Sequence, residues 1–158
     1  MSEAPSQFHY HILGVEQIAL LQPLWKKLNA YEGALSAHFS GSFRARDFQQ
    51  RKWEFVEKSK TSEVYIDLVT CDGSRDYIGY TIASLSPESH GEIDNIFVDE
   101  AYRGSGIGTV LMQRALAWMD ARGATSKSVV VLFENDPAMR FYARFGFYPK
   151  TASLVQIV

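Results

Sequence analysis

The stretch "YRGSGIGT", residues 102–109, places three glycines within five positions, flanked by an arginine and a threonine. Glycines let a backbone approach a ligand without a Cβ in the way. The residues after it have a helical apolar pattern, with Arg122-Gly123 as the expected end. The apolar positions of that pattern are Ile107, Leu111, Ala115, Trp118 and Met119. A helix N-terminus carries unpaired N–H groups and a partial positive charge, so we expect this stretch to bind phosphate groups.

Two common phosphate-binding motifs do not fit these residues. The P-loop of nucleoside triphosphatases needs a lysine after its last glycine, and the stretch contains no lysine. A dinucleotide-binding fingerprint would need its third glycine at position 109, which is Thr109. That fingerprint also belongs to the first strand–helix–strand unit of a chain, whereas this stretch lies far along the sequence.

The rest of the chain alternates between strand-like and helical patterns. Strands are predicted at 10–15, 64–70, 77–85, 91–98, 128–133 and 147–158, with 128–133 as a buried central strand. An early helix runs through Ile18 and Leu28 and starts or kinks at Pro23, and residues 29–42 are predicted as a loop with at most a helical turn.

Two further helices have clear capping signals. Asp47 is predicted to cap a second helix, with Gln50 as its reciprocal partner. In "NDPAMRFYARFG", Asp136 is predicted to cap a short helix, Pro137 fits its first turn and Gly146 ends it. The order of elements is β-α-α-β-β-β-α-β-α-β. The sequence therefore predicts an α/β protein with a central mixed sheet, as a single domain over residues 1–158.

Composition limits the class of protein. The 158 residues are 46% hydrophobic and carry a formal charge of −2, which gives no general field to attract nucleic acid. Cys71 is the only cysteine, so the chain has no internal disulfide and no zinc ribbon. The N-terminus lacks the pattern of a signal peptide, and no apolar run is long enough to span a membrane. We expect a cytoplasmic protein without a membrane or nucleic-acid partner.

The segment "VDEAYRGSGIGTVL" resembles the acetyl-CoA motif of the GNAT superfamily of N-acetyltransferases, in which Arg or Gln precedes x-x-G-x-[GA]. The strand "EIDNIFV" before it and a later pattern in "NDPAMRFYARFGF" also match the superfamily. The positions of that later match are Asn135, Ala138, Phe141, Tyr142, Gly146 and Phe147. The resemblance covers residues 77–148, and the first 60 residues follow it only in the order of their elements.

The resemblance implies where acetyl-CoA binds. The strands at 91–98 and 128–133 would separate beyond their paired part and leave a cleft for the pantetheine arm. The backbone of Ile96, Phe97 and Val98 would hydrogen-bond to that arm. The pyrophosphate would bind at Arg103, Gly104, Ser105, Gly106, Ile107, Gly108 and Thr109. Asn135 and Tyr142 would also contact the cofactor, although capping of a helix or turn is the alternative for Asn135.

The reaction implied is attack of an amine on the thioester. An ammonium group at pH 7 must first lose a proton, at a cost of about 4.6 kcal/mol, so a base is useful. Glu92, six residues before Val98, lies where many members of the superfamily carry a catalytic glutamate. Asp94 shares a strand face with Glu92, and both would attract a cationic amine. The alternatives are that both are solvated charges, or that His90 is the base.

Tyr142 occupies the position that usually donates a proton to the departing thiolate; packing on the helix face is the alternative for it. A backbone N–H near Phe97 would hold the oxyanion, and neither a metal nor a covalent enzyme intermediate is needed. Acceptor contacts would come from the first two helices and the loop between them, where Tyr31, Glu32, His38 and Phe39 are candidates.

The sequence therefore predicts an acetyl-CoA-dependent N-acetyltransferase acting on a primary amine, with a small molecule as the expected acceptor. Acetylation of a protein or peptide amine is one alternative. A GNAT fold that binds acyl-CoA without turnover, as a sensor or structural module, is another. The sequence also leaves a homodimer open.

Overall fold

A five-stranded sheet organises residues 7–158, the part of the chain that the computed structural model describes. The strand order is β1-β2-β3-β4-β5. The strands are β1 (Phe8–Leu13), β2 (Glu63–Cys71), β3 (Tyr77–Leu85), β4 (His90–Val98) and β5 (Ser126–Val129). The first four strands pair antiparallel with their neighbours, and β5 pairs parallel with β4. The sheet is therefore mixed, as the sequence predicts.

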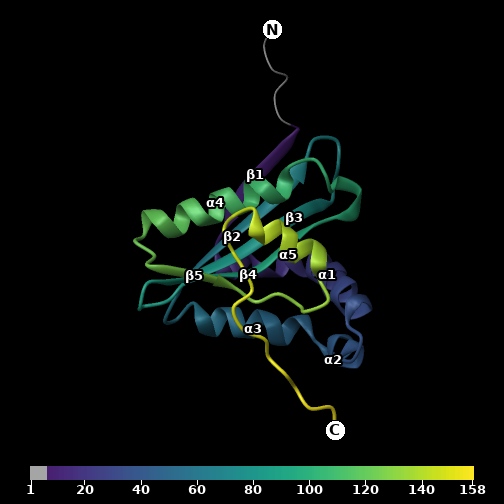
Figure 1. Cartoon of the computed structure of the whole chain (residues 1–158). Coiled ribbons are helices and arrows are strands. Elements are labelled where there is room, and N and C mark those ends of the chain that lie inside the picture. The colour runs from purple at the N-terminus through teal and green to yellow at the C-terminus, as the bar shows by residue number, and fades with distance from the viewer. Residues whose placement is uncertain (1–6) are drawn as a thin grey trace.

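Helices cover both faces of the sheet, with α4 on one side and α3 on the other (Figure 1). The α-helices are α1 (Gln22–Leu35), α2 (Ser40–Ala45), α3 (Phe48–Lys58), α4 (Ile107–Ala121) and α5 (Asp136–Ala143). Short 3-10 helices are η1 (Val15–Leu21) and η2 (Glu100–Tyr102). None of the helices within residues 7–158 is both long and apolar enough to cross a membrane.

The alternation of side chains along the strands divides the core between these two faces. On one face, Ile66, Leu68 and Ile82 pack with residues of η1, α1 and α3. On the other face, Ala83 and Ile93 pack with apolar residues of α4. Every residue of β3 from 78 to 85 is buried, because helices cover this strand on both sides.

The predicted helix signals are confirmed in part. Pro23 lies in the first turn of α1, directly after η1, so the chain changes helix type there as expected. Asp47 caps α3 by accepting a hydrogen bond from Gln49 N at 3.0 Å, but Gln50 does not return the reciprocal bond. The predicted loop at 29–42 is wrong: α1 continues to Leu35 and α2 follows.

Two contacts fix α4 against the sheet. Arg114 Nε donates to Oδ2 of the buried Asp67 on β2 at 2.6 Å. At Gly91 on β4, a Cβ would lie 2.6 Å from Met119 Sδ, so a larger residue would force the Met119 side chain to move. The end of β4 that pairs with β5 is therefore held firmly beneath α4.

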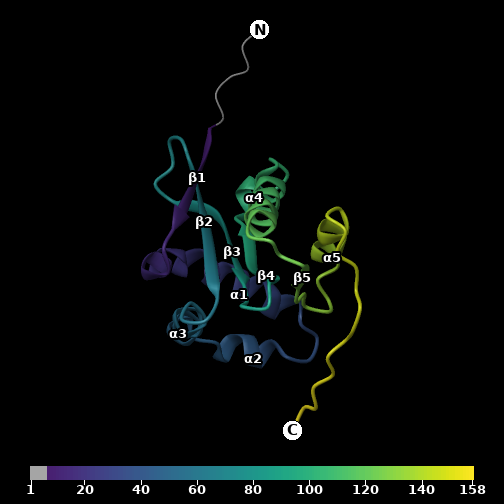
Figure 2. The same ribbon diagram turned by 90° about the vertical axis from the view of Figure 1, so that its left-hand side faces the viewer.

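The two strands predicted nearest the C-terminus differ from the structure. The stretch 128–133 is not a buried central strand: β5 is a four-residue edge strand, and Val130 is 87% exposed because the chain leaves the sheet after Val129. The predicted strand at 147–158 does not form. This segment runs away from the sheet below α5 (Figure 2), and Leu154 is 94% exposed. A β-type sequence needs a neighbouring strand, and none lies beside it here.

Candidate active site

Strands β4 and β5 pair over only part of their length and then separate. Their parallel pairing runs from His90 opposite Ser126 to Ile93 opposite Val129. Strand β4 continues to Val98, whereas the chain after Val129 turns away. The predicted separation of these strands is therefore confirmed. Within residues 7–158, the second half of β4 has β3 on one side and no strand on the other.

The glycine stretch lies after η2 and ends in the first turn of α4, beyond the unpaired end of β4. Gly104 and Gly106 have φ angles of +81° and +87°, in the region that side chains disfavour. A Cβ built on either glycine would have no heavy atom within 4 Å, so both border open space. Because the first N–H groups of α4 lack partners within the helix, a group of acceptor oxygens fits this space.

The third glycine of the stretch has a different role. A Cβ on Gly108 would lie 3.4 Å from Cε2 of Phe141, an ordinary contact distance, so this glycine faces α5 and not open space. Ile107 is 1% exposed and belongs to the core, which leaves only its backbone for a ligand. The stretch thus combines two glycines that border open space with two residues that fix the helix.

Arg103 and Ser105 make contacts within the protein. Arg103 Nε donates to the carbonyl oxygen of Val98 at 3.0 Å, and its guanidinium lies over the rings of Tyr31 and Phe97 at 5.0 and 5.5 Å. Ser105 Oγ donates to the Tyr102 carbonyl. Both side chains stabilise the loop, and their contacts with a cofactor stay predictions.

Thr109 has a cationic neighbour that the sequence analysis did not find. Arg144, at the end of α5, donates from its terminal nitrogen to Thr109 Oγ1 at 3.2 Å. Its guanidinium also lies near the rings of Phe141 and Phe145. The start of α4 therefore has a positive side chain beside its own partial positive charge.

The structure gives Asn135 the alternative role, that of a helix cap. Its Oδ1 accepts a hydrogen bond from Ala138 N at 3.2 Å, so Asn135 is the N-cap of α5. The prediction that Asp136 caps this helix is wrong, because Asp136 already lies in the first turn, where an acidic residue is still favourable. Contact between Asn135 and a cofactor stays a prediction.

Glu92 and Asp94 both face α3, as the two-residue spacing predicts. A bulge opposite Ile82 and Ala83 lies at Asp94, yet both carboxylates still reach Lys58. Lys58 Nζ is 2.6 Å from Asp94 Oδ1 and 3.2 Å from Glu92 Oε2. The protein's own ammonium group thus occupies the place between the carboxylates in which an acceptor amine was expected.

Burial and charge act in opposite directions on this cluster. Burial raises the pKa of Asp94 above its ordinary value, although the contacts with Lys58 and Ser84 lower it. Burial alone would lower the pKa of Lys58, but Asp94 and Glu92 together raise it above its ordinary value. Lys58 is therefore charged at neutral pH.

His90 is the alternative base considered from the sequence. It begins β4 rather than lying in a turn. Its Nδ1 lies 2.6 Å from Ser126 Oγ and its Nε2 lies 2.8 Å from Ser128 Oγ. Both ring nitrogens are thus engaged across the paired part of β4 and β5.

Tyr142 has a buried ring and a hydroxyl group without a partner. Its side chain packs with Phe141, Phe147 and the cluster beneath α4. No residue in the range 7–158 forms a hydrogen bond with its hydroxyl. Burial, and then the charge of Glu32, raise the pKa of Tyr142, so the phenol stays protonated. Packing explains why the ring of Tyr142 is buried, and its unpaired hydroxyl is available as a proton donor.

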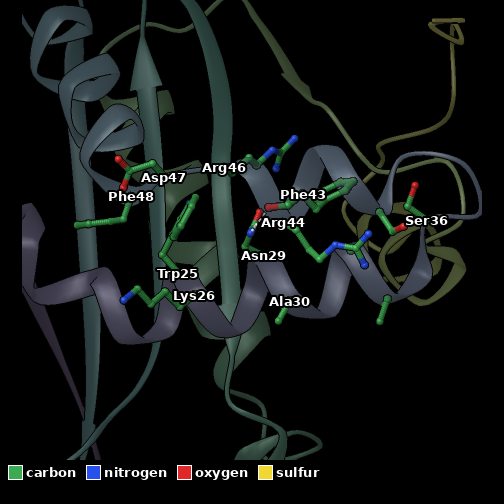
Figure 3. A pocket seen from close by; sticks show the side chains of 13 residues that line it. Trp25, Lys26, Asn29, Ala30, Ser36, Phe43, Arg44, Arg46, Asp47 and Phe48 are labelled. Atoms are coloured by element: carbon green, nitrogen blue, oxygen red, sulfur yellow. Dashed lines mark hydrogen bonds between the residues drawn. The ribbon is translucent and has the colours of Figure 1, made fainter. Parts of the chain in front are cut away.

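A cavity of about 370 Å³ lies between α1, α3 and β4, on the face opposite α4. Glu32 on α1 and Asn95 on β4 both line it, and Asn95 follows the point where β5 leaves β4. Neither Glu92 nor Asp94 lines it. An adjoining outer groove of about 840 Å³ runs along α1 and α2 and is drawn in Figure 3. It shares four lining residues with the cavity, namely Trp25, Asn29, Arg46 and Asp47.

The family is decided by a match to the model of the acetyltransferase (GNAT) family, which covers residues 28–147. The chain belongs to the GNAT family. No cluster of three or more His, Cys, Asp or Glu side chains that could hold a metal ion occurs in the described part of this GNAT chain.

A curated relative is similar over part of the chain. The uncharacterized N-acetyltransferase MJ1207 of Methanocaldococcus jannaschii is 39% identical over 69 residues, which is 44% of this chain and 30% of that protein. The GNAT chain thus matches less than a third of that relative's length.

Solved structures share the fold over nearly the whole chain. A protein from Pyrococcus furiosus described as an acetyl transferase has a TM-score of 0.67 at 21% identity, covering 95% of this chain and 100% of that one. An aminoglycoside N-acetyltransferase solved in complex with CoA has a TM-score of 0.65 at 14% identity, covering 95% and 98%. At these identities the likeness shows the GNAT fold.

Sequence reasoning missed residues that lie around the cavity and the carboxylates. Those residues are Arg46, Arg51, Lys58, Tyr80 and Asn95. Asn95 and Tyr80 carried little signal, because each lies next to another polar residue of its strand, Asp94 and Thr81 respectively. The three cations carried none, because basic residues on an amphipathic helix ordinarily face solvent.

Proposed function

We propose that this chain transfers the acetyl group of acetyl-CoA to a small primary amine by direct attack in a ternary complex. The observation that carries the proposal is the separation of β4 and β5 after Ile93 and Val129, next to a glycine stretch that opens α4. An unpaired strand edge and a helix N-terminus are two sites at which an extended thioester with phosphate groups can bind.

The residues present fit the phosphate groups of acetyl-CoA. Open space borders Gly104 and Gly106, and the N–H groups of residues 104–109 would hold the pyrophosphate. Arg144 adds a cation at the same helix end. The pantetheine arm would bind along the unpaired half of β4, at Ile96, Phe97 and Val98. The CoA complex of the aminoglycoside N-acetyltransferase supports this assignment by likeness of fold.

The acceptor nitrogen forms a bond with the carbonyl carbon of the thioester, and the carbon–sulfur bond breaks. One proton leaves the amine and one is taken up by the departing thiolate, so the products are an amide and free CoA. A base and an acid on the protein each lower the barrier for one of these proton transfers.

Glu92 stays our proposed base, but Lys58 already binds its carboxylate. The Glu92 side chain is 35% exposed, against 5% for Asp94, so it is the more accessible carboxylate. An ammonium group that bound directly at Glu92 and Asp94 would have to compete with the Lys58 ammonium. The alternative route is proton transfer from the amine to Glu92 through water.

Tyr142 is the proposed acid. Its hydroxyl has no partner in the part of the chain that the structure describes, and its raised pKa keeps it protonated at neutral pH. A thiolate has an ordinary pKa near about 8.5 and a phenol near about 10, so the proton transfer needs close positioning. The buried ring supplies that positioning through its packing.

Acceptor contacts are proposed at Tyr31, Glu32 and Asp94. The ring of Tyr31 lies under Arg103, which links α1 to the glycine stretch. Glu32 lies on the same turn of α1 and lines the inner cavity. Asp94 would attract a cationic amine once Lys58 is displaced. The aminoglycoside acetyltransferases among the structural neighbours support a small amine as the class of acceptor.

The test is release of CoA thiol from acetyl-CoA in the presence of a panel of small amines, amino acids and short peptides. Amine-dependent release, with the acetylated product identified by mass, supports the proposal. Tight binding of acetyl-CoA without release for any amine would instead indicate a non-catalytic binding module. Release only with peptides would move the acceptor to a protein amine.

A further inference from the structure

The inner cavity between α1, α3 and β4 is lined by charges of both signs. Its acidic side chains are Glu32, Asp47 and Glu54, and its basic side chains are Arg46 and Arg51. A cavity of about 370 Å³ is of the size that holds a small molecule, since such sites have volumes of about 300–1,000 Å³.

Most of these charges already have partners within the protein. Arg51 binds Glu54, with 2.9 Å between NH1 and Oε2. Asp47 accepts from the backbone of α3 as its N-cap. Glu32 and Arg46 remain: neither side chain has an ion pair or hydrogen bond with any residue from 7 to 158. The cavity therefore holds one free carboxylate and one free guanidinium.

The positions of Glu32 and Arg46 suit a ligand rather than contact with each other. Burial raises the pKa of Glu32, and the more distant charges of Arg46 and Arg51 lower it only in part. The guanidinium of Arg46 lies 4.2 Å from the centre of the Phe43 ring, which fixes its plane. Glu32 and Arg46 thus line the same cavity without binding each other, although the charge of Arg46 still acts on Glu32.

Two buried amide oxygens in the cavity wall lack donors. In the described part of the chain, Oδ1 of Asn29 and Oδ1 of Asn95 have no hydrogen-bond partner. Nδ2 of Asn29 donates to the Phe43 carbonyl at 2.7 Å, which turns its Oδ1 the other way. Because both free atoms are acceptors, a ligand that satisfies them has to bring N–H groups. An ammonium group has three donors and no acceptor.

We propose that the cavity selects acceptors that carry an anionic acid group as well as the amine, as amino acids do. The ammonium group would bind at Glu32 and the Asn95 amide oxygen, beside the open half of β4. The carboxylate would bind at Arg46, whose planar guanidinium can donate two parallel hydrogen bonds. This inference rests on the proposed function, and it names the class of acceptor.

The arrangement disfavours an acceptor with several ammonium groups. Such a molecule would place a second positive charge near Arg46 and Arg51, where like charges repel. An amino acid meets complementary charge at both ends. Selectivity would therefore come from the sign of the charge at the end away from the reacting amine.

The experiment compares each of several amino acids with its carboxamide, which keeps the amine and replaces the carboxylate by a neutral group. We expect kcat/KM of the wild type to be at least about 10-fold higher for the acid, the effect of one charge-assisted contact. Arg46→Gln should lower kcat/KM for the acid about 10- to 100-fold through KM and leave the carboxamide unchanged.

Arg44→Gln is the matched control. Arg44 lies two residues away on α2 and lines only the outer groove, and its side chain leaves the backbone in a different direction from that of Arg46 (Figure 3). This variant should keep the preference for the acid. Arg46→Lys keeps the charge without the planar pair of donors, so it should keep part of the preference for the acid and lose the rest. This variant serves if Arg46→Gln unfolds.

The outcomes separate the acceptor class from the reaction. Equal turnover of acid and carboxamide, or an equal loss with Arg44→Gln, overturns the inference and leaves acetyl transfer standing. Calorimetric titration of amino acids into the CoA-bound protein tests the cavity without turnover. If the wild type binds amino acids and Arg46→Gln binds them more weakly, the inference is supported even where no acetylation occurs. If the wild type neither binds nor acetylates amino acids, the inference is overturned.

Discussion

Lys58 at the end of α3 binds Asp94 on β4, with 2.6 Å between Nζ and Oδ1. The Asp94 side chain is 5% exposed, so the contact is largely buried. Its second oxygen, Oδ2, is buried and has no hydrogen-bond partner among residues 7–158. Lys58 is the main group that favours the charged form of Asp94, with a smaller effect of Ser84. Lys58 also contacts Glu92, so the proposed base is coupled to the stability of the fold.

Replacing Lys58 by methionine should destabilise the protein in a pH-dependent way. Removing one partner of a buried pair costs up to about 5 kcal/mol, and because the Lys58 side chain is 30% exposed we expect about 1–3 kcal/mol at pH 7. Burial raises the pKa of Asp94 in the folded state above its value in the unfolded chain. Protonation of Asp94 therefore stabilises the fold at low pH, and this contribution is lost as the pH rises through the raised pKa. The deficit should therefore shrink as the pH falls through that raised pKa.

Denaturant unfolding of Lys58→Met and wild type at pH 7 and pH 4.5 measures this difference. The double variant Lys58→Met/Asp94→Asn is the control, because it removes both charges and should recover most of the loss at pH 7. A deficit of equal size at both pH values would show that Lys58 stabilises the fold through its aliphatic stem alone.

Glu92→Gln should slow turnover most at neutral pH, where nearly all the amine is protonated. Raising the pH supplies neutral amine from solution, so the ratio of wild-type to variant kcat/KM should fall towards pH 9. The measurement is a pH–rate profile of both proteins on one amine that both accept. A ratio that stays constant across the range would rule out Glu92 as the base.

Asp94→Asn tests attraction rather than proton transfer. Asp94 lies between Lys58 and the bulge in β4, and its proposed role is to draw in a cationic amine. We expect this variant to raise KM for the amine about 3- to 10-fold and to change kcat less. A loss confined to kcat, with KM unchanged, would assign Asp94 to the chemical step instead.

Tyr142→Phe should separate the two roles of that residue. The ring keeps its contacts with Phe141 and Phe147, and the hydroxyl has no partner to lose in the described part of the chain. We expect kcat to fall roughly 10- to 1000-fold with the melting temperature within about 2 °C of wild type. Turnover near the wild-type rate with a lower melting temperature would show that Tyr142 only packs.

Gly106→Ala should block the phosphate groups of acetyl-CoA, since its Cβ would enter the open space beside α4. Gly123 is a matched control: its φ is +76°, it ends the same helix, and a Cβ there also meets nothing within 4 Å. Both variants should lose about 1–2 kcal/mol of stability through backbone strain. Calorimetry should show a Kd for CoA at least about 10-fold higher for Gly106→Ala alone.

Local sequence signals predicted most of the fold. Pro23, Asp47 and Gly123 mark helix ends in the sequence, and the structure uses all three as expected. Such signals depend on a few neighbouring residues and on the conformation of one backbone unit, so a single sequence is enough to read them. The antiparallel pairing of β2 with β3 was predictable for the same reason, since the turn at 72–73 joins them.

Contacts between distant segments could not be predicted in this way. Lys58 reaches Asp94 across 36 residues, and Glu32 comes near Asn95 only because α1 packs on β4. The strand expected at 147–158 has the right residues but no neighbour to pair with. In each case the outcome depends on which surfaces meet after the chain has folded, which the pattern of one segment does not contain.

Arg144→Gln should weaken the binding of CoA and reduce its dependence on salt. Arg144 lies at the end of α5, and its terminal nitrogen donates to Thr109 Oγ1 in the first turn of α4 at 3.2 Å. A phosphate at the start of α4 would lie close to both side chains. We expect Kd for CoA to rise about 3- to 10-fold at low salt, with a smaller difference at 0.5 M salt because the ions screen the charge. Arg140→Gln is the control. Arg140 is an exposed residue of the same helix, and its replacement by glutamine removes the same charge. An equal loss in both variants would mean that only net charge matters, and no loss with Arg144→Gln would mean that the Thr109 contact merely joins α5 to α4.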